Sequence, residues 1–171
     1  MLRTPAPLTR TLGLRESSVV NLELRFPPPL VALVAVLLMW LLSHTLPRTE
    51  ALGSARIPIA IVLAVFGLAF AVSGAMQFKR AHTTVNPRTP EGTSILVTNG
   101  IYRITRNPMY VGLMLVLLGW AAFLASPISL GGVVGFIAYI TRFQIKPEEQ
   151  ILIEKFGDEY QKYFLGRRRW I

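Results

Sequence analysis

Four long apolar blocks constrain the fold of this chain more than any other feature. They cover Pro29–Leu46, Ile57–Phe78, Pro108–Ser126 and Ile128–Phe143. A helix that crosses the hydrocarbon core of a bilayer needs roughly 20 apolar residues. The first three blocks are near that length, and the fourth is shorter but ends at Arg142, whose long side chain can reach the headgroup region. The sequence therefore predicts an all-α, polytopic membrane protein with about four transmembrane helices.

The third and fourth blocks meet at the dipeptide Ser126-Pro127. A connection this short predicts a tight helical hairpin, and Pro127 suits the first turn of the helix that follows. Gly131 and Gly135, four residues apart in the fourth block, would let a neighbouring helix approach closely.

Basic residues gather on one side of the predicted helices. The chain has 18 Lys and Arg against nine acidic residues, a net charge of +9. With four spans, all of the basic residues except Arg48 and Arg56 fall in the N-terminal segment, the loop between the second and third helices, or the C-terminal segment. Because positive charge marks the cytoplasmic side, both termini are predicted to be cytoplasmic.

Composition and length narrow the remaining possibilities. The chain has no Cys and only two His, which excludes disulfides and a thiolate nucleophile and argues against a metal site. The apolar blocks make nucleic acid an unfavourable partner despite the high positive charge. A length of 171 residues indicates one domain. We expect that domain over 26–171, after a basic lead-in over 1–25.

The segment from Pro147 onward predicts an amphipathic cytoplasmic helix. Glu148 and Glu149 lie in its first turn, where the helix dipole favours acidic side chains. Apolar side chains then recur every four residues, at Leu152, Phe156, Tyr160 and Phe164. The final residues, Gly166–Ile171, combine three Arg with a Trp and suit a lipid headgroup region.

Polar residues with possible chemistry lie in two segments, 82–110 and 144–169. Arginines there could bind a carboxylate or phosphate, tyrosines a base or a cation, and glutamates an ammonium group. These residues are Tyr102, Arg103, Arg106, Tyr110, Glu148 and Glu149. S-adenosylmethionine would use all of these groups, and a phospholipid headgroup would use the Arg and Glu residues. The simplest alternative is that the arginines anchor a helix end and the tyrosines line the membrane interface.

The second half of the chain is similar to a known enzyme family. Leu96–Gly112, the apolar hairpin and Lys146–Phe164 resemble, in that order, the isoprenylcysteine carboxyl methyltransferases and the related phospholipid methyltransferases. The resemblance covers about residues 83–170, and Thr83–Pro87 looks like bacterial members of the group. It implies S-adenosylmethionine as methyl donor, a cytoplasmic pocket roofed by the C-terminal segment, and a lipophilic acceptor that enters from the bilayer. It also implies a bacterial inner membrane as the location.

The same resemblance assigns residues to the site. It implies cofactor contacts at Leu96, Val97, Tyr102, Asn107, Pro108, Tyr110 and Glu148. Arg106 matches the arginine before the family's His-Pro pair. From the mechanism of methyl transfer we expect Arg106 and Glu149 to be catalytic: Arg106 would meet a carboxylate of the donor or the acceptor, and Glu149, or a tyrosine, could accept a proton from an amine. The resemblance places Arg142 and Gln144 near the acceptor.

Two positions depart from the family pattern. Asn107 stands where family members commonly have His, and it cannot titrate near neutral pH. Gln144 stands where the prenylcysteine enzymes have an Arg for the substrate carboxylate. This second departure weakens the case for a carboxylate acceptor.

The leading hypothesis is therefore an integral membrane, S-adenosylmethionine-dependent methyltransferase. Its acceptor would be lipophilic or small and would present a carboxylate, an amine or a thiol. The alternative is a non-catalytic scaffold or lipid-binding protein with the same helix hairpin. A transporter is disfavoured because the apolar blocks carry no ionisable residue in their middle stretches. The sequence does not predict the oligomeric state.

Overall fold

The computed structural model describes Leu24, residues 26–81 and residues 95–171. These residues form five α-helices with short 3-10 and π turns between them. The elements are α1 (Pro28–Leu42), η1 (Gly53–Ala55), α2 (Arg56–Arg80), η3 (Gly100–Arg103), α3 (Pro108–Leu124), α4 (Ser129–Ile140), η4 (Thr141–Ile145) and α5 (Lys146–Gly166). The all-α prediction is confirmed for these residues. The lead-in over 1–25, except for Leu24, and the Thr83–Pro87 motif lie outside the described residues.

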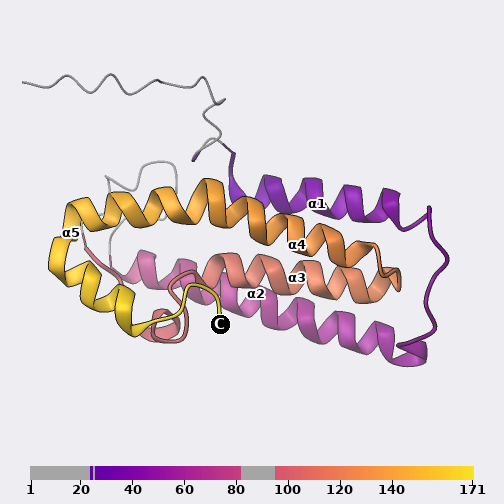
Figure 1. The fold of residues 1–171 in the computed structure, drawn as a ribbon. Helices are drawn as coiled ribbons and strands as arrows, with labels where there is room; N and C mark the ends of the chain where they lie inside the picture. Colours follow the sequence, from indigo (N-terminus) through magenta and orange to yellow (C-terminus); the bar gives the residue numbers. More distant parts are fainter. Residues whose placement is uncertain (1–23, 25, 82–94) are drawn as a thin grey trace, which may run out of the picture.

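Helices α1 to α4 lie side by side along one long axis (Figure 1). The closest pairing is between α2 and α3, where glycines let the two backbones meet. A Cβ added at Gly67 would lie 2.6 Å from the carbonyl oxygen of Gly112, and one at Gly119 would lie 2.8 Å from that of Ala60. Small residues at such positions are what allows two apolar helices to pack without a polar contact.

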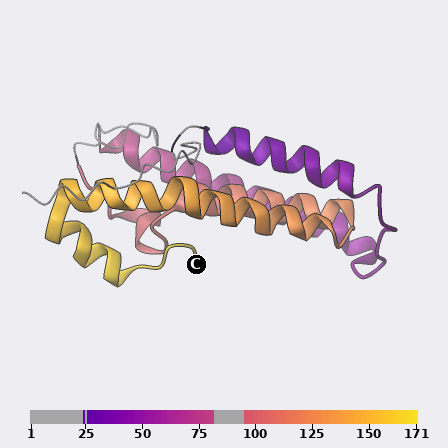
Figure 2. The same ribbon diagram turned by 45° about the horizontal axis from the view of Figure 1, so that its top comes forward.

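Helix α1 lies against α4 and α3 rather than against α2 (Figures 1 and 2). Met39 is fully buried over Gly132, and the indole N–H of Trp120 donates to the carbonyl of Val36 at 3.2 Å. The close approach expected at Gly131 and Gly135 is made at Gly132 instead. A Cβ at either of those two glycines would meet nothing within 4 Å.

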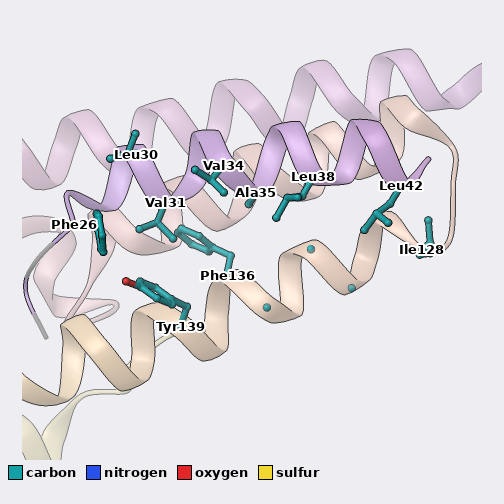
Figure 3. Close-up of a pocket in the computed structure, with 13 residues that line it drawn as sticks. Phe26, Leu30, Val31, Val34, Ala35, Leu38, Leu42, Ile128, Phe136 and Tyr139 are labelled. Atoms are coloured by element: carbon teal, nitrogen blue, oxygen red, sulfur yellow. The ribbon is translucent and has the colours of Figure 1, made fainter. Parts of the chain in front are cut away.

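Gly131 and Gly135 form part of an apolar groove between α1 and α4 (Figure 3). The groove has a volume of about 630 Å³. Phe26 and Tyr139 lie at one end, and Leu42 and Ile128 lie at the other. Its walls are almost entirely hydrocarbon.

The outer surface of the helices is strongly apolar. The stretch Gly53–Arg80 is long and apolar enough to cross a membrane, and α1 and α3 are shorter apolar helices. Leu37, Ile61, Val65 and Val134 are each more than half exposed. An exposed apolar surface of this extent is typical of a helix bundle that faces lipid. The count of four spans and the orientation of the termini stay predictions.

Helix α4 continues into α5 without a break. The sequence suggested a fourth helix and a separate tail helix from Pro147, but the five residues of the π turn η4 join them. The bend comes later, at Gly157, whose φ of 50° and ψ of −126° are accessible to glycine and strained for other residues. Beyond it the chain turns back, and its last residues reach the start of α3 (Figures 1 and 2).

Candidate functional site

The candidate site lies where the start of α3, the first turn of α5 and the C-terminal segment meet. Pro108 opens α3 at a position that needs no backbone donor. Asn107, just before it, makes no capping bond with its side chain. Its amide nitrogen instead donates to the carbonyl of Arg169 at 2.9 Å. The start of α3 is therefore tied to the end of the chain, 62 residues away.

Glu149 is the buried charge at the centre of this junction, with 6% of its surface exposed. Arg169 donates to both of its carboxylate oxygens, from Nε to Oε1 at 3.1 Å and from Nη2 to Oε2 at 2.7 Å. Arg106 also reaches it, with Nη1 2.9 Å from Oε1. A carboxylate held by two arginines is fixed in position and balanced in charge.

Arg106 is a buried charged group with two unpaired N–H groups in the described structure. Its side chain is only 8% exposed, and its guanidinium lies 3.9 Å above the ring of Phe164. Neither Nε nor Nη1 has a hydrogen-bond acceptor, because the contact of Nη1 with Glu149 lacks hydrogen-bond alignment. Buried N–H groups are nearly always paired in folded proteins. Unpaired N–H groups of this kind are able to donate to an anionic or carbonyl-bearing ligand.

Glu148 is the second acid of the site and has different surroundings. It is partly buried, and the hydroxyl of Tyr110 donates to its Oε1 at 2.9 Å. Burial raises the pKa of Glu148 to about 8, with the hydrogen bond from Tyr110 opposing and the neighbouring Glu149 adding to the rise. A carboxyl of this kind is protonated near neutral pH, and a cation placed beside it would favour its ionised form.

Two tyrosines of the site, Tyr102 and Tyr163, are linked by a hydrogen bond. Tyr102 is buried, its ring lies edge-on to Phe78 at 5.5 Å, and its carbonyl accepts from the hydroxyl of Tyr163 at 2.8 Å. Burial raises the pKa of Tyr102, and it raises the pKa of Tyr163 to about 12 against the opposing charges of Arg106 and Arg167. Both hydroxyls therefore act as neutral hydrogen-bonding groups near neutral pH.

The structure gives five of the predicted site residues contacts at this junction. Tyr110 contacts Glu148, Arg106 contacts Glu149, and Asn107 contacts the C-terminal segment. Leu96 and Val97 lie partly buried in the stretch before η3.

The two predicted acceptor residues lie in the π turn η4, in different surroundings. Gln144 is fully buried, and its amide nitrogen donates to the carbonyl of Phe26 at 2.7 Å. Because that nitrogen is committed, its Oε1 remains a buried acceptor with no partner. Arg142 is exposed, with its guanidinium 5.4 Å over the ring of Phe143.

Sequence reasoning missed three contributors to this site. Arg169 was grouped with its neighbours as a headgroup-binding cation, Thr105 was not considered, and Phe164 was interpreted only as part of an apolar stripe. Of three consecutive arginines, sequence alone does not show which one turns inward. The available signal in the sequence was a C-terminal segment of mixed charged and apolar residues that follows a helix with a central glycine.

Comparisons with known proteins agree on a family. The phospholipid methyltransferase family matches residues 55–159. A probable protein-S-isoprenylcysteine O-methyltransferase of Oryza sativa subsp. indica is 30% identical over 108 residues, covering 61% of this chain and 55% of the relative. The protein-S-isoprenylcysteine O-methyltransferase of Xenopus laevis is 30% identical over 148 residues, covering 72% of this chain and 50% of the relative.

A shorter relative matches more strongly. An uncharacterized protein of Haemophilus influenzae is 46% identical over 63 residues, which is 37% of this chain and all of that protein. The chain spans about half the length, or less, of the methyltransferases that it matches. No solved structure matches it. With the family match extending over more than half of its residues, this chain belongs to the phospholipid methyltransferase family.

Proposed function

We propose that this protein is an integral membrane methyltransferase that uses S-adenosylmethionine to methylate a lipophilic acceptor at the cytoplasmic face of the membrane. Its family and the names of its relatives support methyl transfer. The observation that carries the choice of donor is that one junction holds both Arg106, with two unpaired buried N–H groups, and Glu148, a carboxyl that accepts a hydrogen bond from the Tyr110 hydroxyl. One is suited to a carboxylate and the other to an ammonium group, and an amino-acid ligand carries both.

The residues of the chain fit this donor. Arg106 would bind the donor carboxylate through Nε and Nη1, neither of which has a hydrogen-bond partner in the described structure. Glu148 would receive the donor ammonium, and the cation would bring it to its ionised form. Tyr102 and Tyr110 supply the aromatic and hydroxyl surface between them. The donor supplies an already activated methyl group when bound, so the protein needs mainly to align the reactants and exclude water.

Glu149 is better suited to orienting than to proton transfer. A general base must be free to accept a proton from the acceptor. Both of its oxygens already accept hydrogen bonds from Arg169, and Arg106 shares one of them. We therefore assign Glu149 to holding the two arginines in place.

Gln144 favours a particular kind of acceptor. Its free Oε1 accepts hydrogen bonds and donates none, so it would pair with an N–H or O–H group and would oppose a carboxylate. It lies beside Phe26, at one end of the apolar groove. These facts support an acceptor with an amine or hydroxyl head over one with a carboxylate head.

Methyl transfer is tested with the purified full-length chain in lipid nanodiscs. Incubation with methyl-labelled S-adenosylmethionine is expected to move label into the lipid fraction when amine-bearing phospholipid is present. A prenylated cysteine carboxylate added to the same nanodiscs should gain less label. Failure of the chain to bind either the donor or its demethylated product would instead support a non-catalytic scaffold.

A further inference from the structure

The C-terminal segment, Arg167–Ile171, is fixed to the start of α3 by main-chain contacts. The backbone N–H of Arg106 donates to the carbonyl of Arg168 at 3.0 Å. The carbonyl of Arg169 accepts two side-chain hydrogen bonds, from Thr105 Oγ1 at 3.1 Å and Asn107 Nδ2 at 2.9 Å. Two donors on one carbonyl determine where the backbone of Arg169 lies.

This anchoring aims the Arg169 side chain at Glu149 and its neighbours away from it. Arg167 and Arg168 are exposed, whereas Arg169 is partly buried and pairs with both oxygens of Glu149. Its hydrogen bonds with Glu149 raise the pKa of Arg169. The paired fork is the strongest common geometry between a guanidinium and a carboxylate. A segment that served only as a headgroup cation would not place one of three arginines in this way.

The pairing of Arg169 with Glu149 also affects Arg106. Glu149 lies within 2.9 Å of Arg106, and a carboxylate free to rotate would pair with it through two N–H groups. Because Arg169 already holds both of its oxygens, Glu149 gives Arg106 only one misaligned contact. Arg106 is thereby neutralised in charge while its Nε and Nη1 have no hydrogen-bond partner in the described structure.

We propose that Arg169 is a positioning residue of this site. It holds Glu149 away from full pairing with Arg106, and so keeps the donors of Arg106 available for a ligand carboxylate. Thr105 and Asn107 act indirectly, because their hydrogen bonds fix the backbone of Arg169. The inference rests on the proposed function in that the ligand is S-adenosylmethionine.

The test measures binding of S-adenosylmethionine by titration calorimetry with the full chain in detergent. Loss of a charge-assisted hydrogen-bonded contact makes Arg169→Gln bind the donor about tenfold more weakly. Arg169→Lys, with one ammonium group, should fall between wild type and Arg169→Gln. Asn107→Asp keeps the shape but has no N–H donor, and should weaken binding in the same direction. Arg168→Gln is the matched control, and its affinity should stay within about twofold of wild type.

Repeating the measurement in the Glu149→Gln variant separates a positioning role of Arg169 from a merely structural one. When Glu149→Gln removes the competing carboxylate, adding Arg169→Gln should change donor affinity by less than about twofold. An equal loss in both backgrounds would show that Arg169 acts on the fold and not through Glu149. Wild-type affinity in Arg169→Gln would overturn the inference and leave the proposed function intact. Absence of donor binding by the wild-type chain would overturn both.

Discussion

At the scale of single residues, the two adjacent acids of α5 have opposite surroundings. Glu149 is paired with two arginines, whereas Glu148 accepts a hydrogen bond from the hydroxyl of Tyr110. Residues i and i+1 of a helix point in different directions, so neighbours in sequence meet different groups. The pair that the sequence presented as one anionic feature is therefore two groups with separate roles.

Glu148 predicts how stability depends on pH. Its pKa of about 8 in the folded protein lies above the ordinary value of 4.5, so the folded state binds more protons than the unfolded chain between these values. The stability of the ligand-free protein should therefore fall as pH rises from about 5 to 8. Thermal unfolding in detergent at both ends of this range measures the effect.

The variant Glu148→Gln removes this pH dependence while keeping an acceptor for Tyr110. We expect it to be more stable than wild type at pH 8 by at least ~1 kcal/mol, since one pKa unit corresponds to about 1.4 kcal/mol. Glu154→Gln, at an exposed position of the same helix, serves as the control. Equal stability of Glu148→Gln and wild type at pH 8 would show that Glu148 is not held in its neutral form.

At the scale of elements, glycines decide where helices touch. Replacing Gly112 with Ala would place a Cβ 2.5 Å from the carbonyl oxygen of Gly67. Forcing extra volume into a packed interface costs about 1–3 kcal/mol, so Gly112→Ala should lower the unfolding temperature. Gly135→Ala faces open space in the groove and should leave it nearly unchanged. Equal effects of the two substitutions would contradict the packing of α2 on α3.

Gly157 provides a second prediction at this scale. Its backbone conformation costs other residues about 1–3 kcal/mol, so Gly157→Ala should favour a straighter α5. A straighter helix would draw Arg169 away from Glu149, and donor affinity should fall along with stability. Gly166→Ala, near the end of the same helix and in open space, is the control. Unchanged donor affinity in Gly157→Ala would separate the bend from the site.

Much of this element-level picture was predictable from the sequence, and the reasons for the rest are physical. Hydropathy located the four apolar helices, and the four-residue apolar spacing located α5. Sequence did not reveal the continuous α4–α5 junction, because a π turn uses the same residues as an α-helix. The sequence suggested Gly131 and Gly135 as close-packing positions, whereas Gly132 is the one that packs under Met39. Sequence alone does not distinguish these neighbouring glycines.

Much of the candidate site was also predictable from the sequence. The candidates Arg106, Tyr110, Glu148 and Glu149 followed from chemistry and family resemblance, and the structure pairs Arg106 with Glu149 and Tyr110 with Glu148. The role of Arg169 was not predictable, because it depends on the bend at Gly157 and on two hydrogen bonds to a main-chain carbonyl. Long-range backbone contacts of this kind leave no periodic signal in a sequence.

At the scale of the whole molecule, the arrangement of charge predicts a fixed orientation. Because this chain has no Cys, single cysteines can be introduced without a background. In cells, Arg168→Cys should be protected from a membrane-impermeant thiol reagent, and Arg48→Cys should react. Reaction of Arg168→Cys alone would place the C-terminal segment, and with it the site, on the outer side.

Recognition of the donor's carboxylate by Arg106 can be tested in one calorimetric comparison. S-adenosylmethionine is titrated into the wild-type chain, Arg106→Gln, and Arg103→Gln, whose arginine is exposed in the adjacent η3. We expect Arg106→Gln to bind at least about tenfold more weakly than wild type, and Arg103→Gln to bind like wild type. Equal affinity in all three would contradict this expectation, and would return Arg106 to the role of a positively charged anchor at the end of a helix.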